Sequence, residues 1–328
     1  MKALALFSGG LDSLLAAKLI QEQGIEVLAL YFDVGFDSVG IEKKKNYLER
    51  ITKRLGLSFE VINLRDQYIR DILFSPKYGY GKNFNPCIDC HANMFRVAAS
   101  FLETKKASFI ISGEVVGQRP MSQRVVALRQ VAKLSGVEGL VLRPLSAKLL
   151  PVTIPEEKGW VDREKLLDIE GRGRYRQLEL AEKWGLTDYE TPSGGCLLTD
   201  PYFSRKMKEF IKYDKFEVED IEVVKLGRHF RLPGGAKLVM GRNKAENEIL
   251  ATLTLSKYVA FDVPENVLGP ISLISKNASK NDKIIAAKLV MAYTKMPQNK
   301  IYTFEISGEK ITVEHLFGKD STISYRVK

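Results

Sequence analysis

The chain has 328 residues, which is enough for two domains with buried cores. It is 45% hydrophobic and 27% charged, as ordinary soluble proteins are, and no apolar run approaches the ~18 residues that span a bilayer. The N-terminal apolar run ends at two glycines and continues into a helical pattern without a cleavage site, unlike a signal peptide. These features predict a cytoplasmic protein with no membrane partner.

The chain is basic, with a formal net charge of +10. The residues after Thr199 contribute 22 basic and 16 acidic side chains, which is +6 of that total. A basic surface attracts polyanions such as RNA, although charge alone is a weak indicator of RNA binding. The chain has only three cysteines, and this small, odd number argues against a disulfide framework.

Apolar runs and amphipathic patterns alternate along the first part of the chain. The pattern predicts strands at 3–7, 26–32, 59–64, 107–111 and 140–145, and helices at 13–23, 40–55 and 90–101. One or two further helices are predicted over 165–184, interrupted at 171–174. This alternation predicts an α/β fold with a doubly wound parallel sheet.

A second, smaller α+β domain is expected to follow. Pro, Gly and Thr are frequent between Glu190 and Pro201, so the predicted boundaries are an N-terminal domain at 1–189, a linker carrying Cys196 at 190–204, and a basic domain at 205–328. Within that basic domain the pattern predicts strands at 237–240 and 258–261, a helix at 282–293, and a hairpin formed by 302–307 and 310–315.

A glycine-containing turn separates the first strand from the first helix. Its residues are Ser8, Gly9, Gly10, Leu11, Asp12 and Ser13. A doubly wound fold binds anions at such a junction, because the helix N-terminus offers free N–H groups and adjacent glycines let the backbone approach a phosphate. The two serine hydroxyls can donate to phosphate oxygens, and Asp12 can hold Mg²⁺. The alternative is a simple helix cap by Asp12 or Ser13.

The S-G-G-x-D-S motif resembles the signature of the PP-loop ATP pyrophosphatases. The resemblance implies an adenine nucleotide α-hydrolase-like fold and cleavage of ATP between its α and β phosphates, so that AMP activates an oxygen. It implies ATP contacts at Ser8, Gly9, Gly10, Asp12 and Ser13, and we expect Phe32 and Gly113 to line the same nucleotide site.

The three cysteines are candidates for chemistry. Cys87 and Cys90 open a predicted helix at Cys-x-x-Cys spacing, where a thiolate is stabilised, and Cys196 follows Pro192, Ser193, Gly194 and Gly195. The alternative is that they are small buried hydrophobic side chains. His91 directly follows Cys90 and is expected beside that site.

Two further segments are similar to tRNA thiolases. Asn85-Pro86-Cys87 resembles the 2-thiouridine enzymes, and the run from Gly113 to Gln123 resembles the T-G-E-x-x-G-Q-x-x-S-Q region of the 4-thiouridine sulfurtransferases. Three cysteines in this order are also similar to thiolases whose 4Fe–4S cluster has three protein ligands. The resemblance therefore implies Cys87, Cys90 and Cys196 as cluster ligands and catalytic residues together with Asp12, with a cysteine persulfide as the alternative sulfur carrier.

Basic residues are expected to bind tRNA. The 4-thiouridine enzymes have an N-terminal RNA-binding extension, whereas here the glycine turn starts eight residues into the sequence, so the basic C-terminal domain is expected to replace it. Two of its segments, containing Arg228 and Arg242, resemble the G-R-x-x-x-E-N core of an RNA-binding domain of ribosome-quality-control proteins. Further RNA contacts are predicted at Gln118, Arg119, Arg172, Arg174 and Arg176, although the last three also suit a solvated helix face.

The sequence thus predicts an ATP-dependent tRNA sulfurtransferase that adenylates a uridine carbonyl and then inserts sulfur. The prediction favours 4-thiouridine and keeps 2-thiouridine as an alternative. It includes Mg²⁺ and a sulfur donor, either sulfide or a cysteine desulfurase system, and allows a homodimer. The same residues are also compatible with a PP-loop synthetase that uses ammonia and with an RNA-binding adaptor without catalysis.

Overall fold

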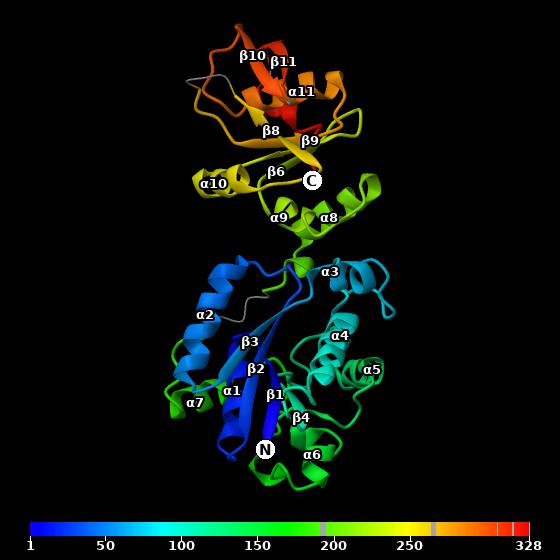
Figure 1. The fold of residues 1–328 in the computed structure, drawn as a ribbon, viewed down its shortest axis with the longest axis vertical. Coiled ribbons are helices and arrows are strands. Elements are labelled where there is room, and N and C mark those ends of the chain that lie inside the picture. The colour runs from blue at the N-terminus through cyan, green and yellow to red at the C-terminus, as the bar shows by residue number, and fades with distance from the viewer. Residues whose placement is uncertain (191–194, 264–266, 307, 317, 328) are drawn as a thin grey trace. The chain divides into compact units, whose positions relative to one another are not determined.

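The chain folds into two compact units. The computed structural model describes residues 1–190, 195–263, 267–306, 308–316 and 318–327. The first unit is Met1–Thr199 and the second is Asp200–Lys328 (Figure 1). The division between Thr199 and Asp200 falls inside the stretch that the sequence predicts as a linker.

A five-stranded parallel sheet forms the centre of the first unit, in the order β3-β2-β1-β4-β5. Its strands are β1 (Lys2–Leu6), β2 (Glu26–Asp33), β3 (Ser58–Asn63), β4 (Phe109–Ser112) and β5 (Val141–Leu142). The middle strands are short apolar runs because helices cover both faces of the sheet, as Figure 1 shows. The predicted α/β class and doubly wound parallel sheet are confirmed.

The strands are joined by helices on both sides of the sheet. They are α1 (Leu11–Gln21), α2 (Ile41–Arg54), α3 (Arg65–Tyr68), the π-helical turn η1 (Ile69–Leu73), α4 (Cys87–Ser100), α5 (Val125–Ser135), α6 (Ile154–Glu157) and α7 (Tyr175–Lys183), with short 3₁₀ turns η2 (Ala147–Leu149), η3 (Arg163–Lys165) and η4 (Leu197–Thr199). Helix α1 is buried on nearly every side, whereas α2 buries a single stripe.

Of the one or two helices predicted over 165–184, one α-helix is formed, and it begins after the predicted interruption at 171–174. Helix α7 covers the second half of this range, and the first half is extended backbone that ends in a turn at Gly171. Gly171 has a φ of +80°, a conformation that interrupts a helix, and its N–H donates to the carbonyl of Val116 at 2.7 Å. The segment therefore packs beside the loop that follows β4.

The second unit contains a six-stranded antiparallel sheet in the order β11-β10-β8-β9-β7-β6. Its strands are β6 (Arg228–Arg231), β7 (Lys237–Met240), β8 (Tyr258–Asp262), β9 (Ser272–Ser275), β10 (Ile301–Ile306) and β11 (Glu309–Glu314). Its helices are α8 (Pro201–Tyr213), α9 (Asp220–Lys225), α10 (Lys244–Thr252) and α11 (Lys280–Met291), and the 3₁₀ turn η5 (Lys319–Thr322) follows β11. A separate antiparallel-sheet domain with helices is thus confirmed, while Ser307 of the predicted hairpin lies outside the described residues.

Charged side chains are buried where α8 meets the sheet of the second unit. Lys237 is fully buried, and its ammonium lies 3.2 Å from the carboxylate of Glu209 on α8. Burial lowers the pKa of Lys237 to about 8, although Glu209 acts in the opposite direction. Because a buried charge is tolerated only with a partner, this ion pair ties α8 to the sheet.

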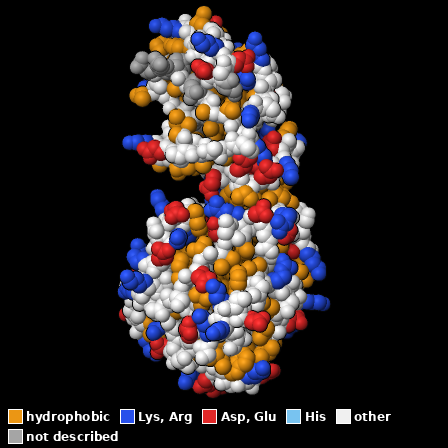
Figure 2. Space-filling model, viewed as in Figure 1, with side chains coloured by type: hydrophobic (Ala, Val, Ile, Leu, Met, Phe, Trp, Pro, Cys, Tyr) orange, Lys and Arg blue, Asp and Glu red, His pale blue; other side chains and the backbone are white. Residues whose placement is uncertain are grey.

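Within the described residues, each helix is too short or too polar to cross a bilayer. Figure 2 shows basic and acidic side chains interspersed over the visible face of each unit.

The turn that precedes β6 provides a test of the second unit. Gly227 has a φ of +70°, and a Cβ there would lie 2.5 Å from the carbonyl oxygen of Met240. Gly227→Ala therefore adds a steric clash of about 1–3 kcal/mol to the cost of a positive φ. Gly308→Ala is the matched control, because Gly308 has a φ of +76° with open space around it. Hydrogen exchange of β6, β7 and β9 should accelerate clearly more in Gly227→Ala than in Gly308→Ala, and equal acceleration would contradict this packing.

Candidate nucleotide and thiol site

The turn between β1 and α1 is held by its own hydrogen bonds. The backbone N–H groups of Ser13 and Leu14 donate to the carbonyl of Gly10 at 3.0 and 3.2 Å, and the Ser13 hydroxyl donates to the same oxygen at 2.7 Å. Gly9 has a φ of +79°, and a Cβ there would lie 2.6 Å from Leu48. Gly9 is thus packed closely against α2, and the turn lies at the N-terminus of a buried helix, where free N–H groups can bind a phosphate.

A segment distant in sequence lies against this turn. The Tyr47 hydroxyl donates to the carbonyl of Gly9 at 2.7 Å and accepts from the N–H of Glu190 at 3.0 Å. Lys44, on α2, is only 3% exposed and pairs with the carboxylates of Glu190 and Asp37. This buried cation beside a candidate phosphate site was not predicted, because Lys44 lies within a run of three lysines that reads as a solvated helix face.

Asp12 is the centre of a polar network. The amide of Gln118 donates to its carboxylate at 2.6 Å, the amide of Gln177 does so at 3.4 Å, and the guanidinium of Arg174 lies 3.5 Å away. Gln177 is fully buried. The structure therefore places Gln118 and Arg174, which the sequence assigns to RNA, at the carboxylate that the sequence assigns to ATP and Mg²⁺.

The end of β4 approaches the same helix terminus. A Cβ on Gly113 would lie 2.6 Å from the backbone of Asp12 and Ser13, so only glycine fits at this position. Phe32, which was expected at the nucleotide, is 6% exposed and packs in the core formed with Leu4 and Phe95. Any nucleotide contact of Phe32 is therefore expected to involve its backbone.

The remaining arginines of the first unit have different surroundings. Arg172 is exposed, and Arg176 pairs with Asp168 at 2.6 Å on the surface. Burial raises the pKa of the Cys87 thiol, and the charge of the exposed Arg119 partly counteracts this, so Arg119 lies near that sulfur. The segment that contains Gln118 and Arg119 thus joins the Asp12 network to the thiols.

Two different structural features bring the three cysteines to one region. Cys87 and Cys90 lie in the first turn of α4. Cys196 is positioned by backbone pairing, since the N–H of Leu197 donates to the carbonyl of Phe36 at 2.8 Å and the N–H of Ser38 donates to the carbonyl of Gly195 at 2.9 Å. Pro192, Ser193 and Gly194 of the same motif lie outside the described residues.

The hydroxyl of Tyr68 lies among the three thiols. Burial raises its pKa, and so do the charges of Cys90, Cys196 and Cys87, while it also hydrogen-bonds Cys90. Burial likewise raises the pKa of Cys90, followed by repulsion from Cys196 and Cys87. For Cys196, although the residue is exposed, desolvation of the thiol raises its pKa to about 12. The thiols therefore interact with one another and are neutral at pH 7 in this arrangement.

The chemistry of these donors fits an iron–sulfur cluster. Sulfur ligands suit such clusters, and hydrogen bonds to the sulfurs tune them. Asn85 donates to the Cys87 sulfur at 3.1 Å, and Tyr68 hydrogen-bonds Cys90. Among the described side chains, however, no group of three His, Cys, Asp or Glu residues is arranged around a single metal ion. The donor set fits a cluster, whereas a site for one ion is not formed.

A buried ion pair supports the start of α4. Glu114 accepts from His91 at 2.7 Å and from the guanidinium of Arg143 at 2.8 Å. Burial alone would raise the pKa of Glu114, but Arg143 and His91 outweigh it and lower the pKa to about 2. His91 therefore lies as expected beside the cysteines, and it is held there by a carboxylate from the end of β4.

Two family models match the chain. The tRNA methyl transferase HUP domain matches residues 1–139, and the NFACT protein RNA binding domain matches residues 227–320. The first match covers the glycine turn, Cys87, Cys90 and the Gly113–Gln123 segment, and the second covers Arg228 and Arg242.

Curated relatives are similar over part of their length. The tRNA-specific 2-thiouridylase MnmA 1 of Clostridium botulinum is 32% identical over 117 residues, which are 32% of this chain and 32% of that protein. The bifunctional protein NifU/MnmA of Rubrobacter xylanophilus is 27% identical over 241 residues, which are 69% of this chain and 45% of that protein. The chain thus spans about a third of the first relative and less than half of the second.

A solved structure of a 4-thiouridine synthetase–RNA complex with bound ATP is similar at 21% identity and a TM-score of 0.40, over 68% of this chain and 52% of its own. The HUP-domain match and the curated relatives confirm the resemblance to PP-loop tRNA-thiolating proteins.

The Glu114 ion pair predicts a defined pH dependence. Because its folded pKa of about 2 lies below the ordinary 4.5, Glu114 stabilises the fold above about pH 4.5 and loses this contribution as the pH falls toward 2. The difference corresponds to roughly 3 kcal/mol. Glu114→Gln should lower the free energy of unfolding by about 3–5 kcal/mol at pH 7, because it leaves Arg143 buried without its partner. In this variant the free energy of unfolding should also depend less on pH below about pH 4.5.

Fluorescence-detected urea unfolding measures this effect, because both tryptophans, Trp160 and Trp184, lie in the first unit. Glu164→Gln is the control, since that side chain is 87% exposed, and it should change stability by less than ~0.5 kcal/mol. If the free energy of unfolding of Glu114→Gln fell with acid as steeply as that of the unmodified chain, the lowered pKa of Glu114 would be contradicted.

Proposed function

We propose that the chain is an ATP-dependent tRNA sulfurtransferase, because its N-terminal unit resembles the PP-loop tRNA-thiolating proteins. It adenylates a uridine carbonyl of tRNA and then replaces the carbonyl oxygen with sulfur. The observation that carries this proposal is that Glu190 pairs with the glycine turn at Gly10, while Cys196, a short way further along the chain, interacts with the other thiols. A nucleotide site and a sulfur site on a single sheet edge suit these two steps.

In the first step, the uridine oxygen attacks the α-phosphorus of ATP. A new O–P bond forms, the bond between the α-phosphorus and the bridging oxygen breaks, and pyrophosphate leaves. Ser8, Gly9, Gly10 and Ser13 bind the departing pyrophosphate, aided by the positive end of α1. Lys44 and Arg174 are additional cations whose protein partners, Glu190 and Asp12, lie at the same turn. A nucleotide with Mg²⁺ at Asp12 competes with Arg174 for that carboxylate.

In the second step, a sulfur nucleophile attacks the activated ring carbon. The new C–S bond forms as the C–O bond breaks, and AMP carries the former uridine oxygen away. Adenylation is needed because a carbonyl oxygen is a poor leaving group, whereas AMP is a good one. Cys87, Cys90 and Cys196 hold the sulfur source, and Tyr68 and Asn85 orient two of the three sulfurs through hydrogen bonds. Held by these three residues, a 4Fe–4S cluster would supply a site for sulfide.

The ring position is proposed as 4-thiouridine. The segment from Gly113 to Gln123, which resembles the 4-thiouridine enzymes, places Gln118 on the Asp12 carboxylate and so contributes directly to the candidate nucleotide site. The second candidate is 2-thiouridine, because the curated relatives include proteins named as 2-thiouridylases. The NFACT-type domain is proposed to bind the tRNA, and a sulfide or cysteine desulfurase system to provide sulfur.

Cysteine substitutions separate the two steps. Cys87→Ser, Cys90→Ser and Cys196→Ser should each abolish thionucleoside formation, by at least about 100-fold, because the sulfur source is lost. Pyrophosphate release that depends on tRNA should persist, since the glycine turn is intact. The measurement is mass spectrometry of tRNA nucleosides beside a pyrophosphate assay.

A different function would give a different pattern in the same assays. An ammonia-using synthetase would keep full product formation in all three cysteine variants. A non-catalytic adaptor would release no pyrophosphate with tRNA, and its RNA binding would be unchanged by Asp12→Ala. Either pattern overturns the proposed sulfur transfer.

Anaerobic purification tests the sulfur carrier. The cluster version predicts a brown protein with about four irons and four sulfides per chain, and each cysteine variant should lose most of the iron and the visible absorbance. A colourless, iron-free protein that still thiolates tRNA would exclude the cluster and favour a persulfide on one of the same cysteines.

A further inference from the structure

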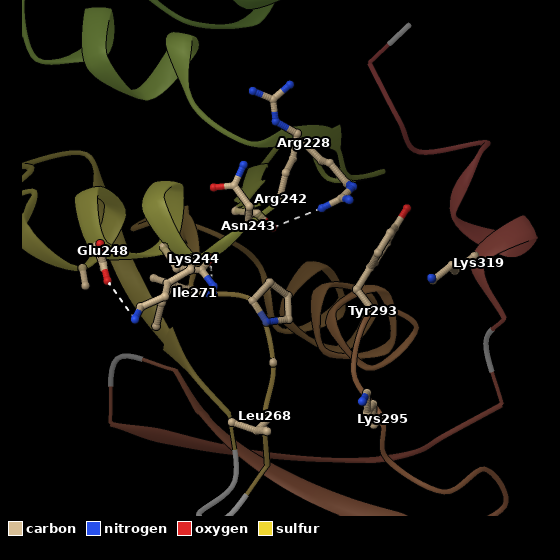
Figure 3. A pocket seen from close by; sticks show the side chains of 15 residues that line it. Arg228, Arg242, Asn243, Lys244, Glu248, Leu268, Ile271, Tyr293, Lys295 and Lys319 are labelled. Carbon is tan, nitrogen blue, oxygen red and sulfur yellow. Dashed lines mark hydrogen bonds and ion pairs between the residues drawn. The ribbon is translucent and has the colours of Figure 1, made fainter. Parts of the chain in front are cut away.

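The second unit contains a concave pocket of about 600 Å³. Figure 3 shows it between the turn that carries Arg242 and Asn243, the strand that carries Arg228, and the end of α11 with Tyr293. Lys295 and Leu268 lie at its lower end in that view, and Lys319 lies beyond Tyr293. The whole pocket is built from described residues of the second unit.

Basic side chains outnumber acidic ones in the lining. Five of them, Arg228, Arg242, Lys244, Lys295 and Lys319, face one acidic residue, Glu248. Arg242 is held by Glu246, and Lys244 lies 3.8 Å from Glu248. Within the described residues, Arg228, Lys295 and Lys319 have no carboxylate within ion-pair distance. The pocket therefore offers three cations that are not neutralised by the protein, which favours an anionic ligand.

An aromatic ring with a fixed orientation forms one side of the pocket. The guanidinium of Arg228 lies 4.9 Å from the centroid of the Tyr293 ring, and the ammonium of Lys319 lies 5.9 Å from it. The Tyr293 hydroxyl is hydrogen-bonded to Thr322 at 3.0 Å. Arg228 donates to the carbonyl of Gly241 at 3.1 Å, so its position is also fixed. Stacked planar groups of this kind are the ones that proteins use to hold unpaired bases.

The opposite wall depends on the G-R-x-x-x-E-N motif. A Cβ on Gly241 would lie 2.0 Å from the side-chain oxygen of Asn247, and that oxygen accepts from the N–H of Ile271 at 3.2 Å. Asn243 caps α10, and Glu246 receives the Arg242 backbone N–H at 2.8 Å. The motif thus holds two loops together and leaves Pro270 and the 86% exposed Leu268 as an apolar floor and rim.

We propose that this pocket binds a single nucleotide of an unpaired RNA strand. The base stacks on the Tyr293–Arg228 pair and contacts the apolar rim at Leu268, while the adjacent phosphates lie against Lys295 and Lys319. This inference rests on the proposed function only in its choice of tRNA as the natural ligand, and it names the unpaired part of that tRNA as what the second unit recognises.

The size and chemistry of the pocket favour this ligand over others. A volume of about 600 Å³ lies within the roughly 300–1,000 Å³ typical of small-ligand sites, which is enough space for a nucleoside. An acidic peptide would satisfy the lysines but has no planar group to place on Tyr293 and Arg228. Duplex RNA keeps its bases stacked on one another and would contact only the cations.

The test measures binding of fluorescein-labelled pentacytidylate to the full chain by fluorescence anisotropy at about 150 mM salt, because the electrostatic part of RNA binding depends on salt. Cytidine avoids both the adenine and the uridine proposed for the first unit. Tyr293→Leu should weaken binding about 10-fold or more, because stacking on the ring is lost, whereas Tyr293→Phe should stay within about 3-fold of the unmodified chain. Lys319→Glu should also weaken binding, and the exposed Lys310→Glu, outside the pocket, is its matched control and should not.

Several outcomes would overturn the assignment. Equal binding by Tyr293→Leu, Lys319→Glu and the controls would place the RNA elsewhere. Equal affinity for a blunt RNA duplex or for pentaglutamate would leave only non-specific charge attraction. Competition by free cytidine monophosphate at the concentration of the pentamer would assign the pocket to a mononucleotide instead of an RNA strand.

Pyrophosphate release with tRNA, measured on the same proteins, separates this inference from the proposed function. Pocket-dependent pentacytidylate binding without pyrophosphate release would leave the pocket assignment standing while the sulfurtransferase proposal fails. Pyrophosphate release, together with pentacytidylate binding that the pocket variants leave unchanged, would overturn the pocket assignment while the sulfurtransferase proposal stands.

Discussion

The close approach between the end of β4 and the start of α1 is the constraint on which the first unit depends. Gly113 has no room for a side chain, because a Cβ would touch the backbone of Asp12 and Ser13. With the two segments in contact, the loop after β4 can send Gln118 back to Asp12, and the neighbouring Glu114 can reach His91 at the start of α4. One packing contact therefore positions the glycine turn and α4, which carries Cys87 and Cys90, relative to each other.

The second cysteine-bearing segment is held by backbone hydrogen bonds. Residues 195–197 pair with 36–38 in the loop that follows β2, and Glu190 pairs with Gly10. Side-chain identity matters little for such pairing, so the return of Cys196 to Cys87 and Cys90 is determined by chain topology. The raised pKa values of Cys90 and Cys196 follow from the same arrangement, since burial and mutual repulsion both disfavour the thiolates. Iron ions would offset the cost of ionising these thiols by their positive charge, so the three cysteines are chemically suited to an iron–sulfur cluster.

The sequence predicted those parts of the molecule that depend on local pattern. The parallel strands, the glycine turn and the Cys-x-x-Cys helix start all have short-range signatures. Tyr68, Lys44 and Gln177 were missed because nothing in their local sequence distinguishes them; each acquires its role from a distant partner. Arg174 was interpreted as an RNA contact because it is one of three arginines at alternate positions, whereas its ion pair with Asp12, 162 positions earlier in the chain, becomes visible only in the fold. The interruption predicted at 171–174 is present, and the fold adds the partner that the sequence does not show, since the N–H of Gly171 donates to the carbonyl of Val116.

The central claim is that AMP leaves with the oxygen of the uridine that receives sulfur. The most direct measurement supplies tRNA whose uridine carbonyl oxygens carry ¹⁸O and follows the label by mass spectrometry of the AMP produced. The account predicts one ¹⁸O atom in AMP for each thionucleoside formed, and labelling only O4 or only O2 identifies the ring position in the same experiment. AMP without ¹⁸O, alongside thiolated tRNA, would contradict adenylation of the uridine and with it the role assigned to the glycine turn.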